Sequence, residues 1–473
     1  MSAEKISVST NAAECWPTRI RDVLAGSADT PMVLLGNFGV EDQWAADEPG
    51  LPRIAVSATR EIAHRMDEFC LLLAGAQDHV LLKSTPDDGH LAHLAALGFE
   101  LPRVLTPALQ DPDRTVTEDV LADPALLKEI GSLPGSPLLW PHGVSEREEL
   151  LAESAGLPLA CPSARICKTV NGKAYSRRIA DELGLRQAQG WICRTVSELH
   201  SAAAGAGHLL DRGGTVVMKD SYGVSGKGLL VLSDRSALER VVRKIARRGE
   251  RTGDDRVNMV VETWVAKKTD LNYQFTIDRA GNCTFDFVRE AVTEGGVHKG
   301  HRIPARLDSD QGAELAEASR RIGARLHADG YVGAVGVDAM VDPDGGLYPI
   351  VEINARNNMS TYQERVRERL IPGGRVALAT QYPLTLSVHL PFDCLADRLR
   401  DTLMTPESPE GLLVSNFATV NAAEHRLLAD GREAFDGRLY GIVVADSDDR
   451  LTALDQQIAA HITAITEENG HGH

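Results

Sequence analysis

The sequence predicts a small parallel α/β domain followed by a larger α+β region. From about residue 30 to 160, short apolar runs alternate with helical stretches, as strands and crossover helices do in a parallel sheet. Farther along the chain, strand-like runs are joined by short glycine-rich connections, which favours hairpins. The chain has 473 residues, 43% of them hydrophobic and 25% charged, which is material for about three domains.

In the first region a strand is expected at Met32–Leu35, followed by the turn Gly-Asn-Phe-Gly at 36–39. A second apolar run occupies 79–82, and Glu146–Ala155 is expected to be a helix closed by Gly156. The turn at 36–39 has two interpretations. It brings backbone N–H groups near a ligand, or it only reverses the chain.

In the second region a helix is expected at 174–183, ended by Gly184. Strands at 215–219 and 229–232 flank the glycine-rich segment 220–228, so this segment connects a hairpin. Further strands are expected at 259–261, 273–277 and 283–288, a helix at 311–327, strands at 412–420 and 439–445, and a closing helix at 451–466.

Composition excludes several function classes. The chain has 50 Lys and Arg against 67 Asp and Glu, and a net charge of -17 repels a phosphate backbone, so we expect no nucleic-acid partner. The seven Cys are odd in number and never form a CxxC pair, which disfavours disulfide frameworks and structural zinc. The uncharged stretch 376–392 is too polar to span a bilayer, and the N-terminus lacks signal-peptide features, so we expect a cytoplasmic protein.

The most informative stretch is 333–358, in which two strand-like runs surround a turn at 342–346. A turn centred on Gly345 sets Asp338 opposite Glu352 and Gly336 opposite Asn354. Period-two alternation then places Glu352, Asn354 and Arg356 on one face. The other face is apolar, with Val335, Val337, Val351, Ile353 and Ala355.

Two carboxylates opposed across a hairpin have Cβ atoms roughly 5 Å apart, which destabilises a sheet unless a positive charge lies between them. Asp338, Glu352 and Asn354 offer the oxygen ligands of a hard divalent cation that also binds phosphate, so we predict a Mg²⁺ site, with Mn²⁺ as the alternative metal. The competing interpretation is an ordinary solvent-exposed polar face. Arg356 in phase with the acids, and the uniformly apolar opposite face, favour the metal.

The glycine-rich segment 220–228 matches neither a P-loop nor a dinucleotide-binding fingerprint, since its spacing differs and a strand follows it. We expect a hinged hairpin loop whose N–H groups and Lys227 fold over a polyphosphate. Lys219, at the end of the preceding strand, is placed to reach the inner phosphates. A flexible surface hairpin gives the same pattern in isolation.

A third segment, 260–265, is an apolar strand that runs into a linker and is followed by Asp270. An adenine ring needs an apolar slot with backbone groups at its edge, and a ribose needs a carboxylate acceptor. Glu262, Val265 and Asp270 meet these needs, although an ordinary strand end has the same composition.

Together these residues resemble the ATP-grasp ligase superfamily over about residues 165 to 360. The motifs occur in the family's order, from Asn-x-Lys at 171–173 through Lys219, the glycine-rich hairpin and Val-Val-Glu-x-x-Val at 260–265 to Asp338 and Glu-Ile-Asn-x-Arg at 352–356. The region before them resembles the pre-ATP-grasp domain. Within the superfamily the layout is most similar to the pheganomycin-type peptide ligases and to ligases that load an amino acid on a carrier protein.

The resemblance implies ATP and Mg²⁺ as cofactors, bound between two lobes. It implies that Arg356 steadies the acyl phosphate or the substrate carboxylate. The basic segment 298–302 departs from the family's pattern, and we expect its Arg302, with Lys299, to contact the γ-phosphate or an acidic substrate. The implied nucleotide-binding residues are Lys173, Lys219, Ser225, Gly226, Lys227, Gly228, Glu262, Trp264, Val265 and Asp270. The implied domains are the pre-ATP-grasp domain at 1–160, the small lobe at 161–265, the large lobe at 266–400 and a C-terminal strand–helix extension at 401–473.

The expected activity is that of an ATP-dependent carboxylate–amine ligase of the EC 6.3 type. A substrate carboxylate attacks the γ-phosphorus in line to give an acyl phosphate and ADP, with Lys219 and Arg356 offsetting charge, and an amine then displaces phosphate. No side-chain nucleophile is required, in agreement with the absence of a GxSxG elbow.

Two alternatives remain open at the level of sequence. The acyl group is transferred to a carrier-protein thiol instead of an amine, or the chain is a nucleotide-binding module without turnover. We expect a small, amino-acid-like carboxylate and an amine or peptide acceptor, a role in specialised peptide or antibiotic biosynthesis, and a homodimer as the default oligomer.

Overall fold

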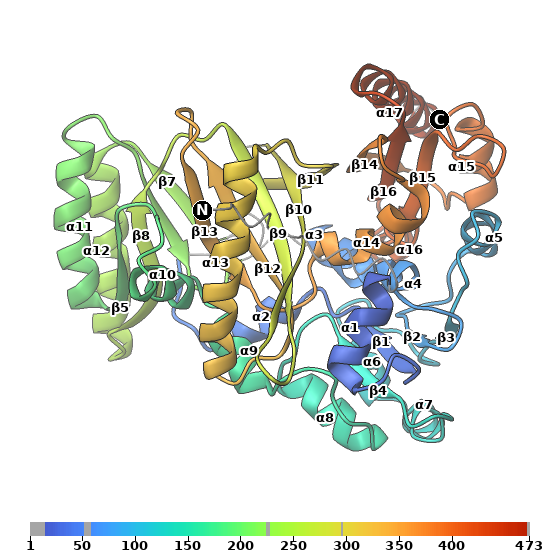
Figure 1. Ribbon diagram of the computed structural model, residues 1–473, viewed down its shortest axis with the longest axis horizontal. Helices are drawn as coiled ribbons and strands as arrows, with labels where there is room; N and C mark the ends of the chain where they lie inside the picture. The colour runs from blue at the N-terminus through green and yellow to red at the C-terminus, as the bar shows by residue number, and fades with distance from the viewer. Residues whose placement is uncertain (1–14, 52–57, 224–227, 295–296, 471–473) are drawn as a thin grey trace, which may run out of the picture.

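In the computed structural model, described over residues 15–51, 58–223, 228–294 and 297–470, the chain forms three sheets with helices around them (Figure 1). Within these residues no helix is both long and apolar enough to cross a bilayer. Ser225, Gly226 and Lys227 lie outside the described residues.

The first sheet confirms the predicted parallel α/β domain. Its four parallel strands run in the order β3-β2-β1-β4, as expected for strands joined by helical crossovers. The turn at 36–39 packs tightly, because a Cβ on Gly36 would lie 2.4 Å from the Cα of Asp67. The strands are β1 (Met32–Leu35), β2 (His79–Leu81), β3 (Arg103–Leu105) and β4 (Leu138–Pro141), and the surrounding helices include α1 (Trp16–Ala25), α6 (Val116–Leu121) and α8 (Glu146–Ala155).

The second sheet is a small antiparallel lobe in the order β5-β8-β6-β7. Its buried face packs against two helices through residues such as Leu199, Leu238 and Val242. The hairpin β6–β7 carries the glycine-rich segment, as predicted. The elements are β5 (Gly190–Thr195), β6 (Val216–Asp220), β7 (Leu229–Leu232), β8 (Arg256–Thr263), α11 (Val196–Leu210) and α12 (Arg235–Thr252).

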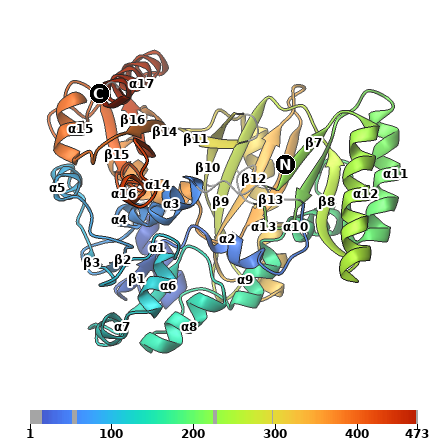
Figure 2. The ribbon, with the colours of Figure 1, turned by 180° about the vertical axis from the view of Figure 1, so that it is seen from behind.

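The third sheet has eight strands in the order β13-β12-β9-β10-β11-β14-β16-β15, with every neighbouring pair antiparallel. The strands after residue 400 therefore continue the sheet begun by the hairpin that carries the acids, as seen from behind in Figure 2. The strands are β9 (Thr269–Ile277), β10 (Cys283–Glu294), β11 (Val297–Ile303), β12 (Gly333–Val341), β13 (Leu347–Asn354), β14 (Val376–Leu386), β15 (Gly411–Asn416) and β16 (Phe435–Ala445).

Helices cover this sheet where its side chains are apolar. The predicted helix at 311–327 is α13 (Ser309–Ala328), which packs Leu315, Ile322 and Leu326 into the core beneath β9 and β10. The predicted closing helix is α17 (Asp448–Gly470), which lies against β14 and β16. The bounds of the four domains inferred from resemblance remain a prediction.

Candidate active site

A cavity of about 620 Å³ lies between the small lobe and the large sheet. Its walls come from β6 and β8 on one side and from β9 to β13 on the other. Helices also line it, among them α2 (Val40–Trp44), α10 (Lys173–Glu182) and α14 (Met359–Leu370). Lys173, Lys219, Asp338 and Glu352 all line this cavity, although 179 positions separate the first from the last.

The acidic hairpin has the predicted register at the site. Asp338 pairs with Glu352 and Gly336 with Asn354. A β-bulge between Asp338 and Met340 shifts the pairing nearer the turn, where Met340 faces Tyr348. Val335, Val337 and Ile353 are buried on the opposite face, whereas Val351 is only partly buried and lines the cavity.

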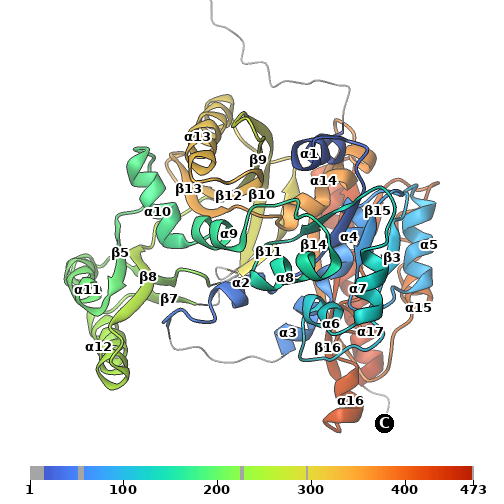
Figure 3. The same ribbon diagram turned by 90° about the horizontal axis from the view of Figure 1, so that it is seen from below.

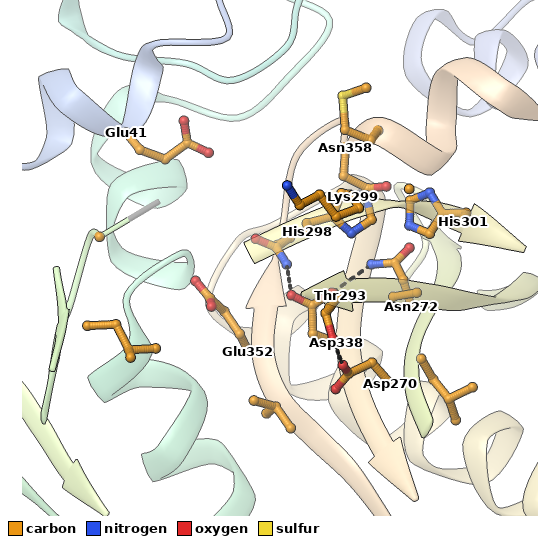
Figure 4. A pocket seen from close by; sticks show the side chains of 18 of the residues that line it. Glu41, Asp270, Asn272, Thr293, His298, Lys299, His301, Asp338, Glu352 and Asn358 are labelled. Atoms are coloured by element: carbon orange, nitrogen blue, oxygen red, sulfur yellow. Dashed lines mark hydrogen bonds between the residues drawn. The ribbon is translucent and has the colours of Figure 1, made fainter. Parts of the chain in front are cut away.

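Asp338 is held by two amide groups (Figure 4). Asn272 Nδ2 donates to its Oδ1 at 2.8 Å, and Asn354 Nδ2 donates to its Oδ2 at 3.2 Å. Desolvation and, second to it, the charge of Glu352 raise the pKa of Asp338 to about 6. The carboxyl group is therefore poised to gain stabilisation from a nearby cation.

Glu352 is neutralised by a lysine rather than left facing Asp338 alone. Lys173 Nζ donates to Glu352 Oε1 at 2.6 Å and to the carbonyl of Gly223 at 2.7 Å. The positive charge required near the two acids is thus supplied by the ammonium group of Lys173 at Glu352. From the sequence, Lys173 had been expected to bind a phosphate. Lys173 links the acidic hairpin to the start of the glycine-rich connection.

The donor set fits Mg²⁺, because Asp338 and Glu352 bring two carboxylates to a cavity with room for phosphate oxygens. The oxygen of Asn354 accepts from Arg356, so its amide would have to turn to become a metal ligand. Among the described residues, no group of three His, Cys, Asp or Glu side chains is arranged to hold a metal. A site that takes two carboxylates from the protein and its other ligands from an amide, phosphate and water agrees with that observation.

Lys219 is paired in the same manner. Its Nζ contacts Glu262 Oε1, while Glu262 Oε2 lies 3.2 Å from Arg177 Nη1. Arg177 was missed by sequence reasoning, although its i, i+4 spacing from Lys173 on α10 (Lys173–Glu182) places both on one helix face. Lys173 and Lys219 therefore both line the cavity, and each is paired with a glutamate.

Arg356 joins the site to the first domain. Its Nη2 contacts Glu41 Oε1 and donates to Asn354 Oδ1 at 3.2 Å. Glu41 lies in the first turn of α2, directly after the turn at 36–39. Nothing in the local sequence around Glu41 marks it as a site residue, because its partner lies more than 300 positions away.

The basic segment 298–302 is only partly where it was expected. His298, Lys299 and His301 line the cavity, but Arg302 does not: its guanidinium contacts Asp448 of α17. Residues of a strand point alternately to opposite faces, so Arg302 turns away where His301 turns in. The structure thus gives Arg302 an ion-pair partner outside the cavity, and the γ-phosphate contact predicted for it finds no support.

The two histidines are neutral. Their ring centroids are 4.5 Å apart, and burial lowers the pKa of His298 to about 4 and that of His301 as well. Figure 4 shows both rings on the same side of the cavity as Asn358. They present hydrogen-bonding groups without charge.

The comparisons with known proteins agree with this geometry. The model of the pre-ATP-grasp domain matches residues 66–157, and that of the carbamoyl-phosphate synthase L chain, ATP binding domain matches residues 172–363. Residues 66–363 therefore match the domain pair of the ATP-grasp superfamily. Enzymes of that superfamily use ATP and Mg²⁺.

Curated relatives include a butirosin acyl-carrier protein–L-glutamate ligase from Niallia circulans, 25% identical over 333 residues, which are 69% of this chain and 72% of the relative. A carbamoyl phosphate synthase large chain from Rhodopirellula baltica is 25% identical over 210 residues, which are 43% of this chain but only 18% of that protein. The likeness to the synthase therefore concerns one segment of a much longer protein.

Solved structures support the ATP-grasp fold. A β,γ-ATP complex of biotin carboxylase from Campylobacter jejuni has a TM-score of 0.52 at 13% identity, and the match covers 92% of this chain and 94% of that one. An ADP complex of an N5-carboxyaminoimidazole ribonucleotide synthetase has a TM-score of 0.50 at 13% identity, covering 93% and 98%.

The predicted nucleotide end of this ATP-grasp cavity is lined by Glu262, Trp264, Val265, Asp270 and Gly228. Asp270 accepts a hydrogen bond from Thr293 Oγ1 at 2.5 Å, shown in Figure 4. It also contacts Lys267. Gly228 has a φ of +75°, and a Cβ there would lie 2.8 Å from a carboxylate oxygen of Asp220, so glycine is required at this end of the loop.

The opposite end of the ATP-grasp cavity is aromatic. The ring centroid of Phe38 lies 4.3 Å from that of His142 and 5.3 Å from that of Tyr362, and Phe69 lies 5.2 Å from Tyr440. All five rings line the cavity. Burial and the charge of Arg356 hold the pKa of His142 well below its usual value, so its ring is neutral. Arg438, which also lines the cavity, donates from Nη1 to the Tyr440 hydroxyl at 3.2 Å and brings a positive charge to this end. Phe38 belongs to the turn at 36–39.

Proposed function

We propose that the chain is an ATP-dependent ligase that activates a small carboxylate as an acyl phosphate and joins it to an amine, releasing ADP and phosphate. The observation that carries the proposal is the pairing of Asp338 with Glu352 in a cavity that also holds Lys173 and Lys219. A site with two opposed acids and two lysines suits a metal-bound polyphosphate better than a simple anion or a simple cation.

In this proposal Asp338, Glu352 and Asn354 hold Mg²⁺, which neutralises phosphate charge and orients the nucleotide. Lys173 and Lys219 exchange their glutamate partners for phosphate oxygens. Both ion pairs lie in one cavity, so the exchange needs only side-chain rotation. The glutamates thus keep the lysines in place until the nucleotide arrives.

Arg356 is proposed to bind the carboxylate that becomes phosphorylated. It lies between the acidic hairpin, through Asn354, and the aromatic end, where its charge acts on His142 and Tyr362. The body of the acid then extends toward Phe38 and its neighbours. The aromatic wall suits the carbon skeleton of the acid, because ring faces pack against apolar groups.

A second candidate keeps the activation step and transfers the acyl group to a carrier-protein thiol. The specific observation in its favour is the similarity to the butirosin acyl-carrier protein–L-glutamate ligase, which extends over 69% of this chain. The same relative supports a role in specialised biosynthesis.

An ADP-release assay tests the proposal, with a panel of amino acids as acids and of amines and short peptides as acceptors. We expect ADP and phosphate only when a matching acid and ATP are present, with amide product seen by mass spectrometry. Release of AMP and pyrophosphate would contradict acyl-phosphate chemistry. Incubation with carrier proteins separates the two acceptors, because a thioester adds the acyl mass to the carrier.

A further inference from the structure

Helix α12 is strongly basic in an otherwise acidic chain. Its 18 residues contain seven Arg and Lys side chains against two Glu, whereas the whole chain has a net charge of -17. Leu238, Val242 and Ile245 bury its apolar face against the small lobe. The remaining surface of the helix is therefore strongly basic. Figure 1 shows α12 on the outer side of that lobe.

This face forms one wall of a groove of about 1010 Å³, separate from the active-site cavity. The other wall is the segment 45–51, which leaves α2 and crosses to the small lobe, as seen from below in Figure 3. The basic wall consists of Arg240, Arg243, Lys244, Arg247, Arg248 and Arg251.

The facing wall is held in place by the protein itself. Arg248 Nη1 donates to the carbonyl of Gly50 at 2.8 Å, which ties the segment to α12. Glu48, the one acid in the groove, already accepts from Asn258 Nδ2 at 2.9 Å and pairs with Lys168 at 2.9 Å. The groove is thus formed without an internal acid to neutralise its basic wall.

Four of the basic side chains have no ion-pair partner within the described parts of the chain: Arg243, Lys244, Arg247 and Arg251. All four are exposed. Basic residues on a solvated helix face usually alternate with acids, because like charges on adjacent turns repel each other. A cluster of unpaired cations beside a groove is instead suited to an external anionic partner.

The groove adjoins the catalytic cavity through one short stretch of chain. Phe38, Glu41 and Trp44 line the cavity, and the next residues, 45–51, line the groove. Leu51 N donates at 2.7 Å to Asp220, the last residue of β6 before the glycine-rich connection. Whatever binds the groove therefore lies beside both the first-domain wall of the active site and the base of that connection.

We propose that this groove docks an acidic polypeptide segment beside the active site. A polypeptide is favoured over a nucleic acid, because a phosphate backbone would extend beyond the groove onto a molecule of net charge -17. A short run of Asp and Glu matches the four unpaired cations and needs no larger basic surface. The binding does not depend on which acid the active site uses, so it can be tested without a substrate.

The test is fluorescence anisotropy with a labelled peptide of alternating Glu and Ala, and with the same peptide carrying Gln in place of Glu. We expect the Glu peptide to bind and the Gln peptide not to bind. Added salt should weaken the binding, since exposed charges are screened beyond about 10 Å at 0.1 M. The triple variant Arg243→Glu/Lys244→Glu/Arg247→Glu should lose affinity by about tenfold or more.

The matched control is Arg320→Glu/Arg400→Glu, which reverses two exposed arginines remote from the groove. It should bind as the wild type does, and thermal unfolding should show that both variants are folded. Equal affinity for the Gln peptide, undiminished binding by the triple variant, or displacement of the peptide by a DNA oligonucleotide of equal length at lower concentration would each overturn the proposal.

Discussion

The two ends of the catalytic cavity are built on opposite principles. At the polar end, Lys173 and Lys219 each contact a glutamate, and Asp338 is held by two amides. At the other end, five aromatic rings from separated parts of the chain pack against one another, with His142 neutral among them. Arg356 stands between the two ends.

This difference between the two ends shows how the binding site for a highly charged ligand remains folded when the ligand is absent. Opposed acids and partly buried ammonium groups are costly alone, so the chain pairs them with one another until a ligand replaces those partners. The aromatic end needs no such arrangement, because apolar rings are stable when packed and when covered by an apolar ligand. Substitutions should therefore affect nucleotide use at one end and acid selectivity at the other.

The largest effect is expected for Glu352→Gln. The change removes one of the two opposed carboxylates while leaving an amide of the same shape beside Lys173, so the fold should persist. We expect the rate of ADP release to fall by about 100-fold or more, as when a preorganised charged group at a reaction centre is lost. ADP release at saturating ATP and Mg²⁺ measures it.

Asp344→Asn is the matched control, since Asp344 lies exposed in the turn of the same hairpin. It should turn over at the wild-type rate. Near wild-type turnover of Glu352→Gln would contradict the role of Glu352 as a metal ligand. It would also contradict the assignment of nucleotide binding to the polar end of the cavity.

Lys219→Ala should mainly weaken ATP binding. Glu262 keeps Arg177 as a partner, so the variant should fold, but one charge-assisted contact to phosphate is lost. Such contacts contribute about 1.5–3 kcal/mol, which corresponds to roughly a 10- to 100-fold rise in KM for ATP. Steady-state kinetics in ATP checks this, with Lys128→Ala on the exposed side of α7 (Pro124–Ile130) as control. An unchanged KM would show that Lys219 only pairs with Glu262.

Phe38→Ala acts at the aromatic end and should leave ATP use unchanged. We expect kcat/KM to fall by about tenfold for an acid with a large apolar side chain and to change little for alanine, because only the larger acid reaches the ring. Competition between two acids in one reaction, read by mass spectrometry, gives the ratio directly. An equal loss for both acids would instead indicate that Phe38 supports Arg356 or Glu41.

The difference between the two ends also explains which site residues could be predicted from the sequence. The register of Asp338 and Glu352 follows from one local turn, and the lysines lie in motifs with fixed order, so the polar end was predictable. The aromatic end was not, because Phe38, Phe69, His142, Tyr362 and Tyr440 meet only when the first domain and the C-terminal strands pack together. Arg302 was predicted to contact the γ-phosphate or an acidic substrate, whereas in the structure its guanidinium contacts Asp448 of α17, because side chains alternate along β11.

The smallest expected effect is a pH dependence at Asp338. The pKa is raised to about 6 in the folded protein from 3.8, so protonation favours the nucleotide-free fold. This contribution to stability is present below about pH 4 and is lost as pH rises through 6. The wild type should therefore lose stability relative to Asp338→Asn between pH 4 and 7 in urea unfolding, because the asparagine does not titrate.

The activity of the wild type should change in the opposite direction. Its kcat/KM for ATP should rise between pH 4 and 7, since the ionised carboxylate is the form that binds a cation. If the free energy of unfolding of the two proteins changed with pH in the same way, the pKa of Asp338 would not be raised, and its carboxylate would be in contact with water.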